Sequence, residues 1–202
     1  MGNRSIAELL TAADELAKSR LSERRYAHTI RVADTAEHLA KTHNLDPERT
    51  RLAALIHDAA REMKKDKYLR VAEEWNIPYG DFERENPKLL HGPVAAELSR
   101  RELGVEDGEI LDAVREHTVG RAEMGDISLA LYLADKIEPE RDYPSMEKIR
   151  EMAENDLRAA TTEALRTAIA FGEMRGKTVH PASREALNWL DESDGRPNEG
   201  ME

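Results

Sequence analysis

The sequence predicts an all-α protein, a helical bundle in a single domain. Apolar residues recur with the 3.6-residue period of amphipathic helices along most of the 202 residues. No stretch alternates apolar and polar residues for long enough to predict a strand, and no internal repeat is present. The length suits one domain that buries a core of its own.

The first three helices have clear boundaries. Residues 6–17 place their apolar side chains at the i, i+3, i+4, i+7 spacing, which predicts an amphipathic helix. Ser22 can cap a second helix that runs to about His43. Asp46-Pro47 opens a third, because Pro is favoured in the first helical turn, and this helix is expected to carry His57-Asp58.

The remaining helices are separated by Gly, Pro and capping residues. They are predicted over residues 65–75, 92–104, 107–118, 127–137, 146–155, 157–171 and 183–190, with chain breaks at 78–80 and 86–87. The segment 127–137 is apolar almost all round, which indicates a central buried helix. The polar tail 191–202 is expected to be disordered.

Composition excludes several classes of function. A net charge of −11 supplies no basic stripe, so we expect no nucleic-acid partner. The chain has no cysteine, which excludes disulfides and thiolate chemistry and leaves only His and carboxylates to bind a metal. No apolar run reaches the length of a membrane span, so a cytoplasmic protein without membrane contact is expected.

His57-Asp58 ends the apolar run 52–56, so a carboxylate emerges where the helix should be buried. Burying an ionised carboxylate costs several kcal/mol, roughly, unless something pairs with it. Asp135 raises the same question inside the apolar segment 127–137. A bound metal ion would stabilise both carboxylates.

Three more histidines are expected to point inward. At about 100° per residue, His28 shares a helix face with Val32 and Leu39, and His117 shares one with Val114. His91 precedes a predicted helix start and can be aimed across a cavity. A single inward histidine is more often a hydrogen-bonded core residue than a ligand, but four histidines with two buried carboxylates favour a metal site.

The motifs around these residues resemble those of a known family. The order His…His-Asp…Asp is similar to the HD-domain superfamily of metal-dependent phosphohydrolases, and the two further histidines to its dinuclear branch. The flanking residues resemble the bacterial YqeK family, whose members are symmetrical bis(5′-nucleosyl)-tetraphosphatases, over about 21–190. The motifs that carry this resemblance are Arg25-Tyr26-Ala27-His28-Thr29, Leu55-Ile56-His57-Asp58-Ala59-Ala60-Arg61, Leu89-Leu90-His91-Gly92-Pro93-Val94, Glu116-His117-Thr118-Val119-Gly120-Arg121 and Tyr132-Leu133-Ala134-Asp135-Lys136-Ile137-Glu138-Pro139.

The resemblance implies an HD-domain helical bundle over 21–190, with residues 1–20 as an N-terminal helix packed on it. It also implies hydrolysis of diadenosine tetraphosphate to two ADP at a dinuclear centre, with iron as the metal and manganese or zinc as alternatives. The implied ligands of the first metal are His28, His57, Asp58 and Asp135. Asp58 would bridge to a second metal held by His91 and His117.

Residues next to these ligands are candidates for contact with the substrate. Asp58, Arg61 and Arg121 are assigned to catalysis, Arg61 standing where the family usually has Lys, and Val119 where it usually has Thr. Arg can still bind phosphate, in a bidentate manner. The substrate-binding candidates are Arg61, Thr118, Gly120, Arg121 and Lys136, together with His180, which lies far from the ligands in sequence but resembles a family position near the nucleotide.

Three alternatives remain open at this point. The same fold can hydrolyse another nucleotide, and the same ligands can serve a di-iron oxygenase. A nucleotide-sensing domain with a structural metal is a non-catalytic alternative, which a complete ligand set disfavours. A homodimer is also compatible with several amphipathic helices, because periodicity does not distinguish self-association from core packing.

Overall fold

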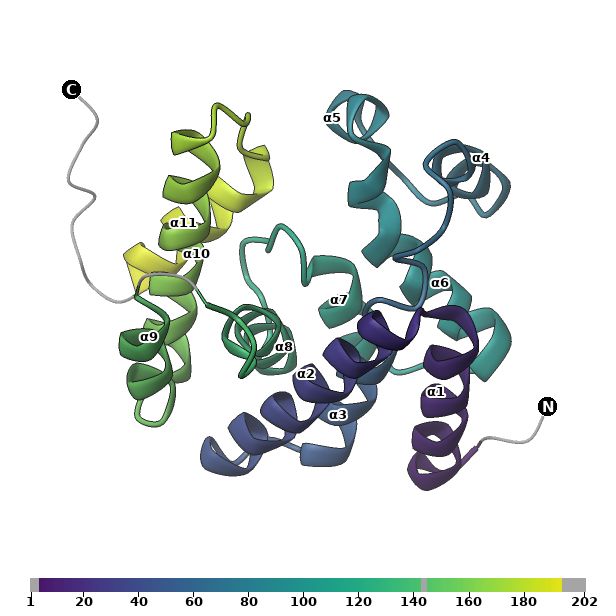
Figure 1. Cartoon of the computed structure of the whole chain (residues 1–202), viewed down its shortest axis with the longest axis horizontal. Coiled ribbons are helices and arrows are strands. Elements are labelled where there is room, and N and C mark those ends of the chain that lie inside the picture. Colours follow the sequence, from purple (N-terminus) through teal and green to yellow (C-terminus); the bar gives the residue numbers. More distant parts are fainter. Residues whose placement is uncertain (1–3, 143–144, 194–202) are drawn as a thin grey trace.

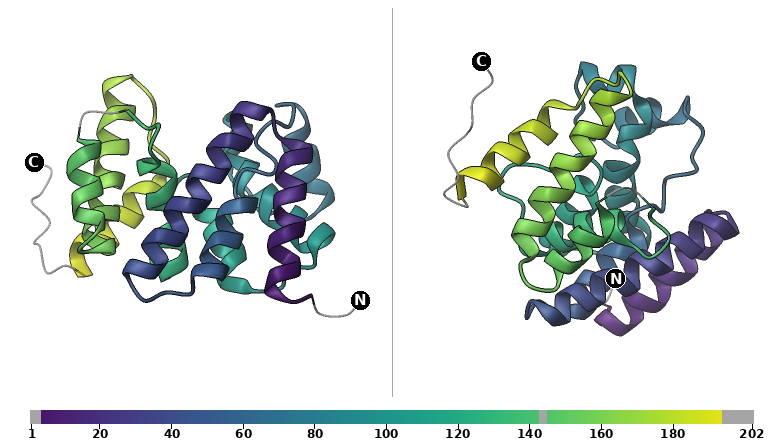
Figure 2. Two further views of the ribbon diagram at one scale, coloured as in Figure 1. Left: turned by 60° about the horizontal axis from the view of Figure 1, so that its bottom comes forward. Right: turned by 60° about the vertical axis from the view of Figure 1, so that its left-hand side comes forward.

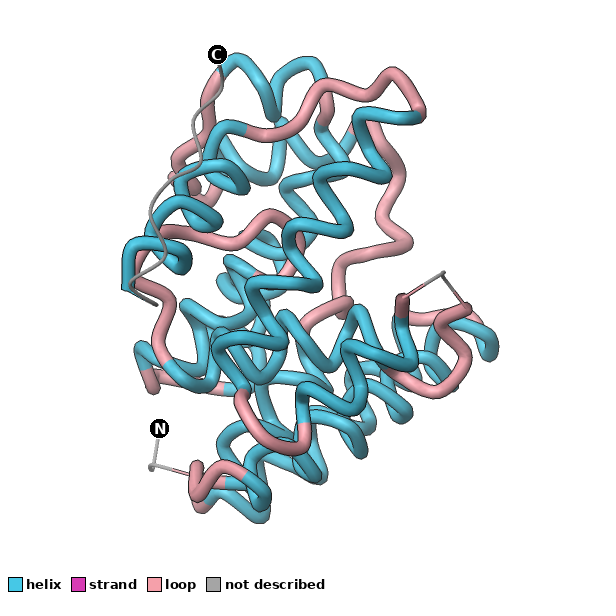
Figure 3. Tube along the Cα trace, turned by 90° about the vertical axis from the view of Figure 1, so that its left-hand side faces the viewer, coloured by secondary structure: helices cyan, strands magenta, loops and turns pink. Residues whose placement is uncertain are grey.

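The computed structural model describes residues 4–142 and 145–193, which fold into a helical bundle with no strand in those ranges (Figures 1 and 3). The helices are α1 (Ile6–Arg20), α2 (Glu23–Thr42), α3 (Pro47–Ile56), α4 (Lys67–Glu74), α5 (Asp81–Glu85), the 3₁₀ helix η1 (Pro87–Leu90), α6 (His91–Leu103), α7 (Gly108–Glu116), α8 (Asp126–Ile137), α9 (Met146–Ala153), α10 (Leu157–Met174) and α11 (Pro181–Ser193). The prediction of an all-α, single-domain bundle is confirmed.

Helix α8 is the centre of the bundle. Its residues from Ile127 to Asp135 are all buried, as the apolar segment 127–137 predicts. It packs against α2, α3 and α7 on one side and against α9 and α10 on the other. Figure 1 accordingly shows α8 between the larger N-terminal group of helices and the α9–α11 group, and the left view of Figure 2 shows the same separation.

The N-terminal group is held by helix pairs that are close in sequence. Helices α2 and α3 pack along each other, α1 lies against α3, and α6 pairs with α7. Ser22 caps α2 and Asp46 caps α3 through bonds from backbone N–H groups, at the positions that the sequence indicates. These caps fix where the helices begin and hence which face turns inward.

Two local predictions differ from the structure. Helix α3 ends at Ile56, so His57-Asp58 lies in the turn just after it and not within it. The segment predicted only as breaks around residues 78–90 contains α5 and η1, and α6 already begins at His91. Pro87 interrupts α-helical hydrogen bonding but is accommodated in the first turn of η1, which the sequence interpretation missed.

The ends of the chain are described in part. Within the predicted tail, residues 191–193 continue α11, and 194–202 lie outside the described residues. No helix in the described ranges is both long and apolar enough to cross a membrane.

Candidate metal centre

Three buried histidines share one local arrangement. The Nδ1 atoms of His57, His91 and His117 each lie 2.6–2.7 Å from the backbone carbonyl oxygen three residues earlier. A carbonyl oxygen can only accept a hydrogen bond, so each Nδ1 carries the proton and donates it. The lone pair is therefore on Nε2 in all three rings, and Nε2 is the atom that points into the interior.

These Nε2 atoms meet fewer hydrogen-bond donors than they have lone pairs. The Nε2 atoms of His91 and His117 face each other at 3.0 Å, although neither has a proton to give. The Thr118 hydroxyl lies 3.2 and 3.1 Å from them and can donate to only one. The Nε2 atoms of His57 and His28 are buried without a hydrogen-bond partner. A cation among these lone pairs would satisfy them all, so the residues present fit a metal ion.

Asp58 lies between two groups of possible ligands. One group is His28, His57 and Asp58, the other is Asp58, His91 and His117, and within each the ligand atoms lie within 4.8 Å of one another. Oδ2 of Asp58 is 3.6 Å from Nε2 of His57, and Oδ1 is 3.4 Å from Nε2 of His91. Asp135 joins the first group, its Oδ1 3.1 Å from Nε2 of His28. One carboxylate can therefore face two cations.

Gly92 allows the second group to form. A Cβ at this position would lie 2.8 Å from the Val114 carbonyl oxygen and 3.2 Å from the His117 ring. The N-terminus of α6 therefore packs directly on the C-terminus of α7, which brings His91 and His117 together. Only glycine permits so close an approach of two backbones.

His28 is oriented differently from the other three rings. Its Nδ1 lies 3.1 Å from Oε1 of Glu138, a buried carboxylate that also accepts a 2.7 Å bond from Nε of Arg31. A carboxylate behind an imidazole fixes the ring and strengthens it as a ligand. Sequence reasoning missed Glu138, although its position directly after the apolar segment 127–137 was a usable signal.

The protonation states suit metal binding. Burial lowers the pKa of His57 and lowers that of His117 well below its usual value, so both rings are neutral at pH 7. Burial alone would raise the pKa of Asp58, but the neighbouring imidazoles outweigh it and the pKa is well below normal. The pKa of Asp135 is lowered against its burial too, chiefly by Lys136. Neutral imidazoles and ionised carboxylates are the forms that bind metals.

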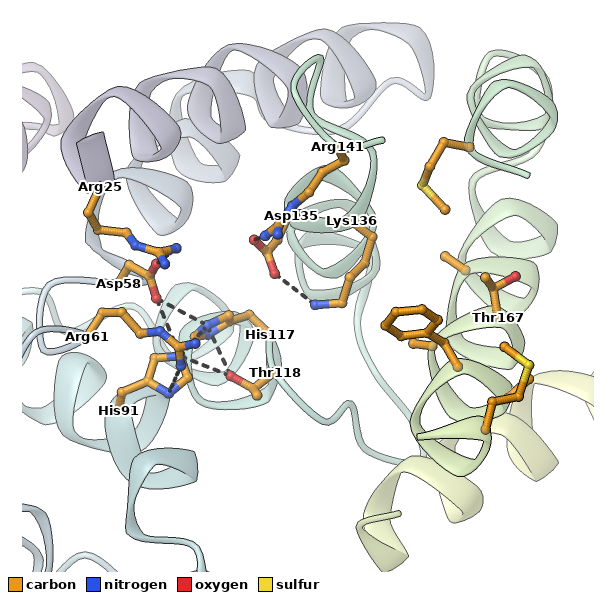
Figure 4. Close-up of a pocket in the computed structure, with 16 residues that line it drawn as sticks. Arg25, Asp58, Arg61, His91, His117, Thr118, Asp135, Lys136, Arg141 and Thr167 are labelled. Carbon is orange, nitrogen blue, oxygen red and sulfur yellow. Dashed lines mark hydrogen bonds and ion pairs between the residues drawn. The ribbon is translucent and has the colours of Figure 1, made fainter. Parts of the chain in front are cut away.

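A cavity of about 540 Å³ opens directly on this cluster (Figure 4). Four cationic side chains line it, namely Arg25, Arg61, Lys136 and Arg141. Arg25 donates to Oδ2 of Asp58 at 3.0 Å, and Lys136 and Arg141 each lie 2.8 Å from a different oxygen of Asp135. In a chain of net charge −11, this cavity is a local concentration of positive charge suited to an anionic ligand.

Arg61 is placed against a ligand histidine. Its Nη1 lies 3.1 Å from Nδ1 and 3.3 Å from Nε2 of His91. Because Nδ1 already donates to a carbonyl, the guanidinium packs on the imidazole and its other N–H groups remain for a ligand. Thr118 and Lys136, two further substrate-binding candidates, also line the cavity.

The structure does not bring the other three candidates to the cavity lining. Arg121 turns away, donating from Nε to Glu116 at 2.6 Å beside a separate surface depression. Gly120 has a positive φ of 74° and packs near Ala186. This backbone conformation favours glycine and accounts for the residue without a role in substrate binding. His180 pairs with Glu83 of α5 at 2.7 Å.

Two cationic residues of the cavity were missed by sequence reasoning. Arg25 lies three residues before His28, on the same face of α2, so the helical period could have identified it. Arg141 lies beyond the end of α8, where no periodicity constrains the direction of a side chain. Its position could be found only from the fold.

Comparisons of the sequence and the structure with known proteins agree on one family. The HD domain profile matches residues 25–140, more than half of the chain. The symmetrical bis(5′-nucleosyl)-tetraphosphatase of Bacillus subtilis (strain 168) is 36% identical over 173 residues, 86% of this chain and 92% of the relative. The protein with that same description from Staphylococcus aureus is 33% identical over 186 residues, 91% of this chain and 95% of the relative.

A solved structure has the same fold over nearly the whole chain. It is the crystal structure of a protein from Clostridium acetobutylicum that is described as a "predicted HD superfamily hydrolase involved in NAD metabolism". It is 31% identical, covers 95% of this chain and 100% of its own, and superposes with a TM-score of 0.87.

Proposed function

Because the chain belongs to the HD-domain family, and its relatives are symmetrical bis(5′-nucleosyl)-tetraphosphatases over nearly their whole length, we propose that it cleaves diadenosine tetraphosphate into two ADP. The single observation that carries this proposal is Asp58, a carboxylate shared by two histidine groups at the floor of a cationic cavity. Such an arrangement suits a dinuclear metal centre that acts on a polyphosphate.

We propose two divalent ions, with iron as the metal and manganese or zinc as alternatives. His28, His57, Asp58 and Asp135 would hold the first. Asp58, His91 and His117 would hold the second. When bound, such ions lower the pKa of a water molecule and neutralise charge on phosphoryl oxygens. All ligand atoms are nitrogen or carboxylate oxygen, a donor set that suits each of these metals.

The protein's own contribution is to position the phosphate chain. Arg61 and Arg25 lie on the side of the cavity next to Asp58, and Lys136 and Arg141 lie next to Asp135 (Figure 4). A polyphosphate between these pairs would replace Asp58 as the partner of Arg25, and Asp135 as the partner of Lys136 and Arg141. Arg61 can bind phosphate with two parallel N–H groups, and Lys136 acts as a compact charge. These contacts would hold the central anhydride at Asp58.

The same four cations favour hydrolysis of a phosphate compound over an oxygenase reaction on an uncharged substrate, because an uncharged substrate would not pair with cationic side chains. A smaller nucleotide remains a distinct outcome of the test, since its phosphates would meet the same residues.

Product analysis tests the proposal. The full chain is loaded with iron(II), manganese(II) or zinc(II) and incubated with diadenosine tetraphosphate, and the nucleotides are separated by anion-exchange chromatography. We expect ADP as the only product with at least one metal. Formation of ATP and AMP, or no turnover with any of the three, would contradict it.

A pair of arginine variants tests the binding role. Arg61→Ala should raise KM by about tenfold or more, the loss of one charge-assisted phosphate contact. Arg70→Ala is the matched control, because Arg70 is exposed on α4 and does not line the cavity. Equal effects of the two substitutions would remove Arg61 from the proposal.

A further inference from the structure

The cavity has two unlike walls. The wall described above carries the histidines, the carboxylates and the four cations. The opposite wall is built from α10 with one residue of α9, and Figure 4 shows Thr167 on α10 across the cavity from Asp58 and Arg61. This wall is apolar, with only one polar side chain among its members: Met146, Ala164, Thr167, Ala168, Ala170, Phe171 and Met174.

Part of this apolar wall is exposed. Met174 is 78% exposed and is the one large hydrophobic side chain in the described ranges that is classed as exposed. Ala168 and Ala170 are exposed beside it, whereas apolar residues elsewhere on α10, such as Leu165, are buried. Apolar surface that is left open beside a charged site marks a ligand-binding groove more often than chance.

The spacing of residues on the apolar wall suits the stacking of a flat ring. Ala164, Ala168 and Phe171 follow the i, i+4, i+7 spacing, so one face of α10 carries small side chains that end in an aromatic ring. Arg175 packs its guanidinium 4.7 Å from the centroid of the Phe171 ring, which steadies that ring. Small residues beside an aromatic ring leave room for a flat heterocycle.

Thr167 adds a polar group to this surface. Thr161 and Thr162 of the same helix donate their hydroxyls to carbonyl oxygens four residues earlier, at 2.8 and 2.9 Å. Within the described residues Thr167 makes no such bond, and Thr167 lines the cavity. It can therefore hydrogen-bond to a ligand.

We propose that the apolar wall of α10 is the nucleobase subsite, on which one base of the substrate packs against Phe171 and Met174 while its phosphates reach the cationic wall. This inference rests on the proposed function for its choice of ligand. A nucleotide is the ligand that combines a flat apolar base with several negative charges, which matches the two walls. A cavity of about 540 Å³ has the size that holds one small ligand, so it takes one nucleoside half of the substrate.

The test compares ADP with pyrophosphate, which carries the phosphates without the base and its ribose. Their affinities for the metal-loaded full chain are measured by calorimetry, for the wild type and for Phe171→Ala, Phe171→Leu and Arg166→Ala. ADP should bind the wild type about fivefold to 100-fold more tightly than pyrophosphate, the range for one base stacked on one aromatic ring. Phe171→Ala should remove most of that difference and leave pyrophosphate binding unchanged.

The other variants separate the possible causes. Phe171→Leu keeps apolar bulk and should retain part of the preference for ADP. Arg166→Ala, on the opposite and exposed side of α10 where Arg166 pairs with Asp191, should retain all of it. Equal affinity of the wild type for ADP and pyrophosphate would overturn the subsite. So would an equal loss of both ligands in Phe171→Ala, or a change of oligomeric state in that variant, which would make the wall a contact between two copies.

Failure of this inference is distinguishable from failure of the proposed function. If the wild type prefers ADP through Phe171 but leaves diadenosine tetraphosphate intact, the base subsite stands and the substrate is wrong. If the wild type cleaves the tetraphosphate but Phe171→Ala changes neither KM nor ADP affinity, the function stands and the subsite is wrong.

Discussion

The two histidine groups that share Asp58 are supported by different kinds of interaction. In the first, His57 donates to a backbone carbonyl oxygen, but His28 contacts the Glu138–Arg31 ion pair, and Asp135 is paired with Lys136 and Arg141. In the second, His91 and His117 donate to backbone carbonyl oxygens, and the close approach at Gly92 sets their separation. Charge therefore tunes the first group, and backbone packing shapes the second.

This difference has a chemical consequence. A carboxylate behind an imidazole raises its basicity and so its affinity for a metal, whereas a backbone carbonyl mainly fixes the tautomer. The first group should therefore respond to changes of charge at a distance, and the second to changes of volume. Asp58 belongs to both groups, so its replacement should affect both.

The largest effect is expected from Asp58→Ala. Because both groups lose their shared carboxylate, both metals should be lost together and turnover should fall by about a thousandfold or more. Metal content by plasma mass spectrometry and steady-state kinetics measure the two effects. Asp58→Asn keeps the shape of the side chain and shows whether its charge is required. Retention of one tightly bound metal in Asp58→Ala would contradict the sharing.

Glu138→Gln tests the charged support of the first group. Gln can still accept the bond from His28 but has no charge, so metal affinity there should fall by about tenfold to 100-fold. The second group should be unchanged, which calorimetric titration with metal can resolve as one weakened step. Glu140→Gln is the matched control, since Glu140 is exposed and pairs only with Arg31 among the residues described. Equal weakening of both steps would break the proposed division of the site.

Gly92→Ala tests the packed support of the second group. The new Cβ would meet the Val114 carbonyl oxygen at 2.8 Å, so α6 and α7 must separate, at a cost of about 1–3 kcal/mol in unfolding free energy. Urea denaturation measures this cost. Gly108→Ala is the control, because a Cβ there meets nothing within 4 Å. If Gly92→Ala is as stable as the wild type, the close approach does not hold His91 and His117 in place.

Much of the candidate metal centre could be predicted from the pattern of residues along the sequence. The helical period placed His28 and His117 on buried faces, and the cost of burying Asp58 and Asp135 indicated a metal. These inferences depend on local geometry, which the sequence determines well. The helix boundaries near His57 and His91 were off by one or two residues because tertiary contacts decide where a helix ends.

The supports of the site were harder to predict. Glu138, Arg141 and the α10 wall come from segments that meet the histidines only in the folded chain. Arg121 shows the converse: it lies next to a ligand region in the sequence, but in the fold it pairs with Glu116 and does not line the cavity. Beyond the end of a helix, adjacency in sequence predicts the direction of a side chain poorly, because the helical period no longer applies there.

The smallest effect concerns the scaffold of the second group and its response to acid. On α6, bonds from Arg100 and then Arg101, opposed by partial burial, lower the pKa of Glu97 to about 2. A folded-state pKa below the unfolded value of roughly 4.3 gives stability that is complete above that value and is lost as the pH falls toward about 2.

Glu97→Gln should therefore lower the unfolding free energy by about 0.5–1 kcal/mol at neutral pH, a small value because both arginines are largely exposed. The difference from the wild type should shrink steadily below about pH 4 in urea denaturation of the metal-free protein. A difference that stays constant down to about pH 3 would show that Glu97 does not act through its charge.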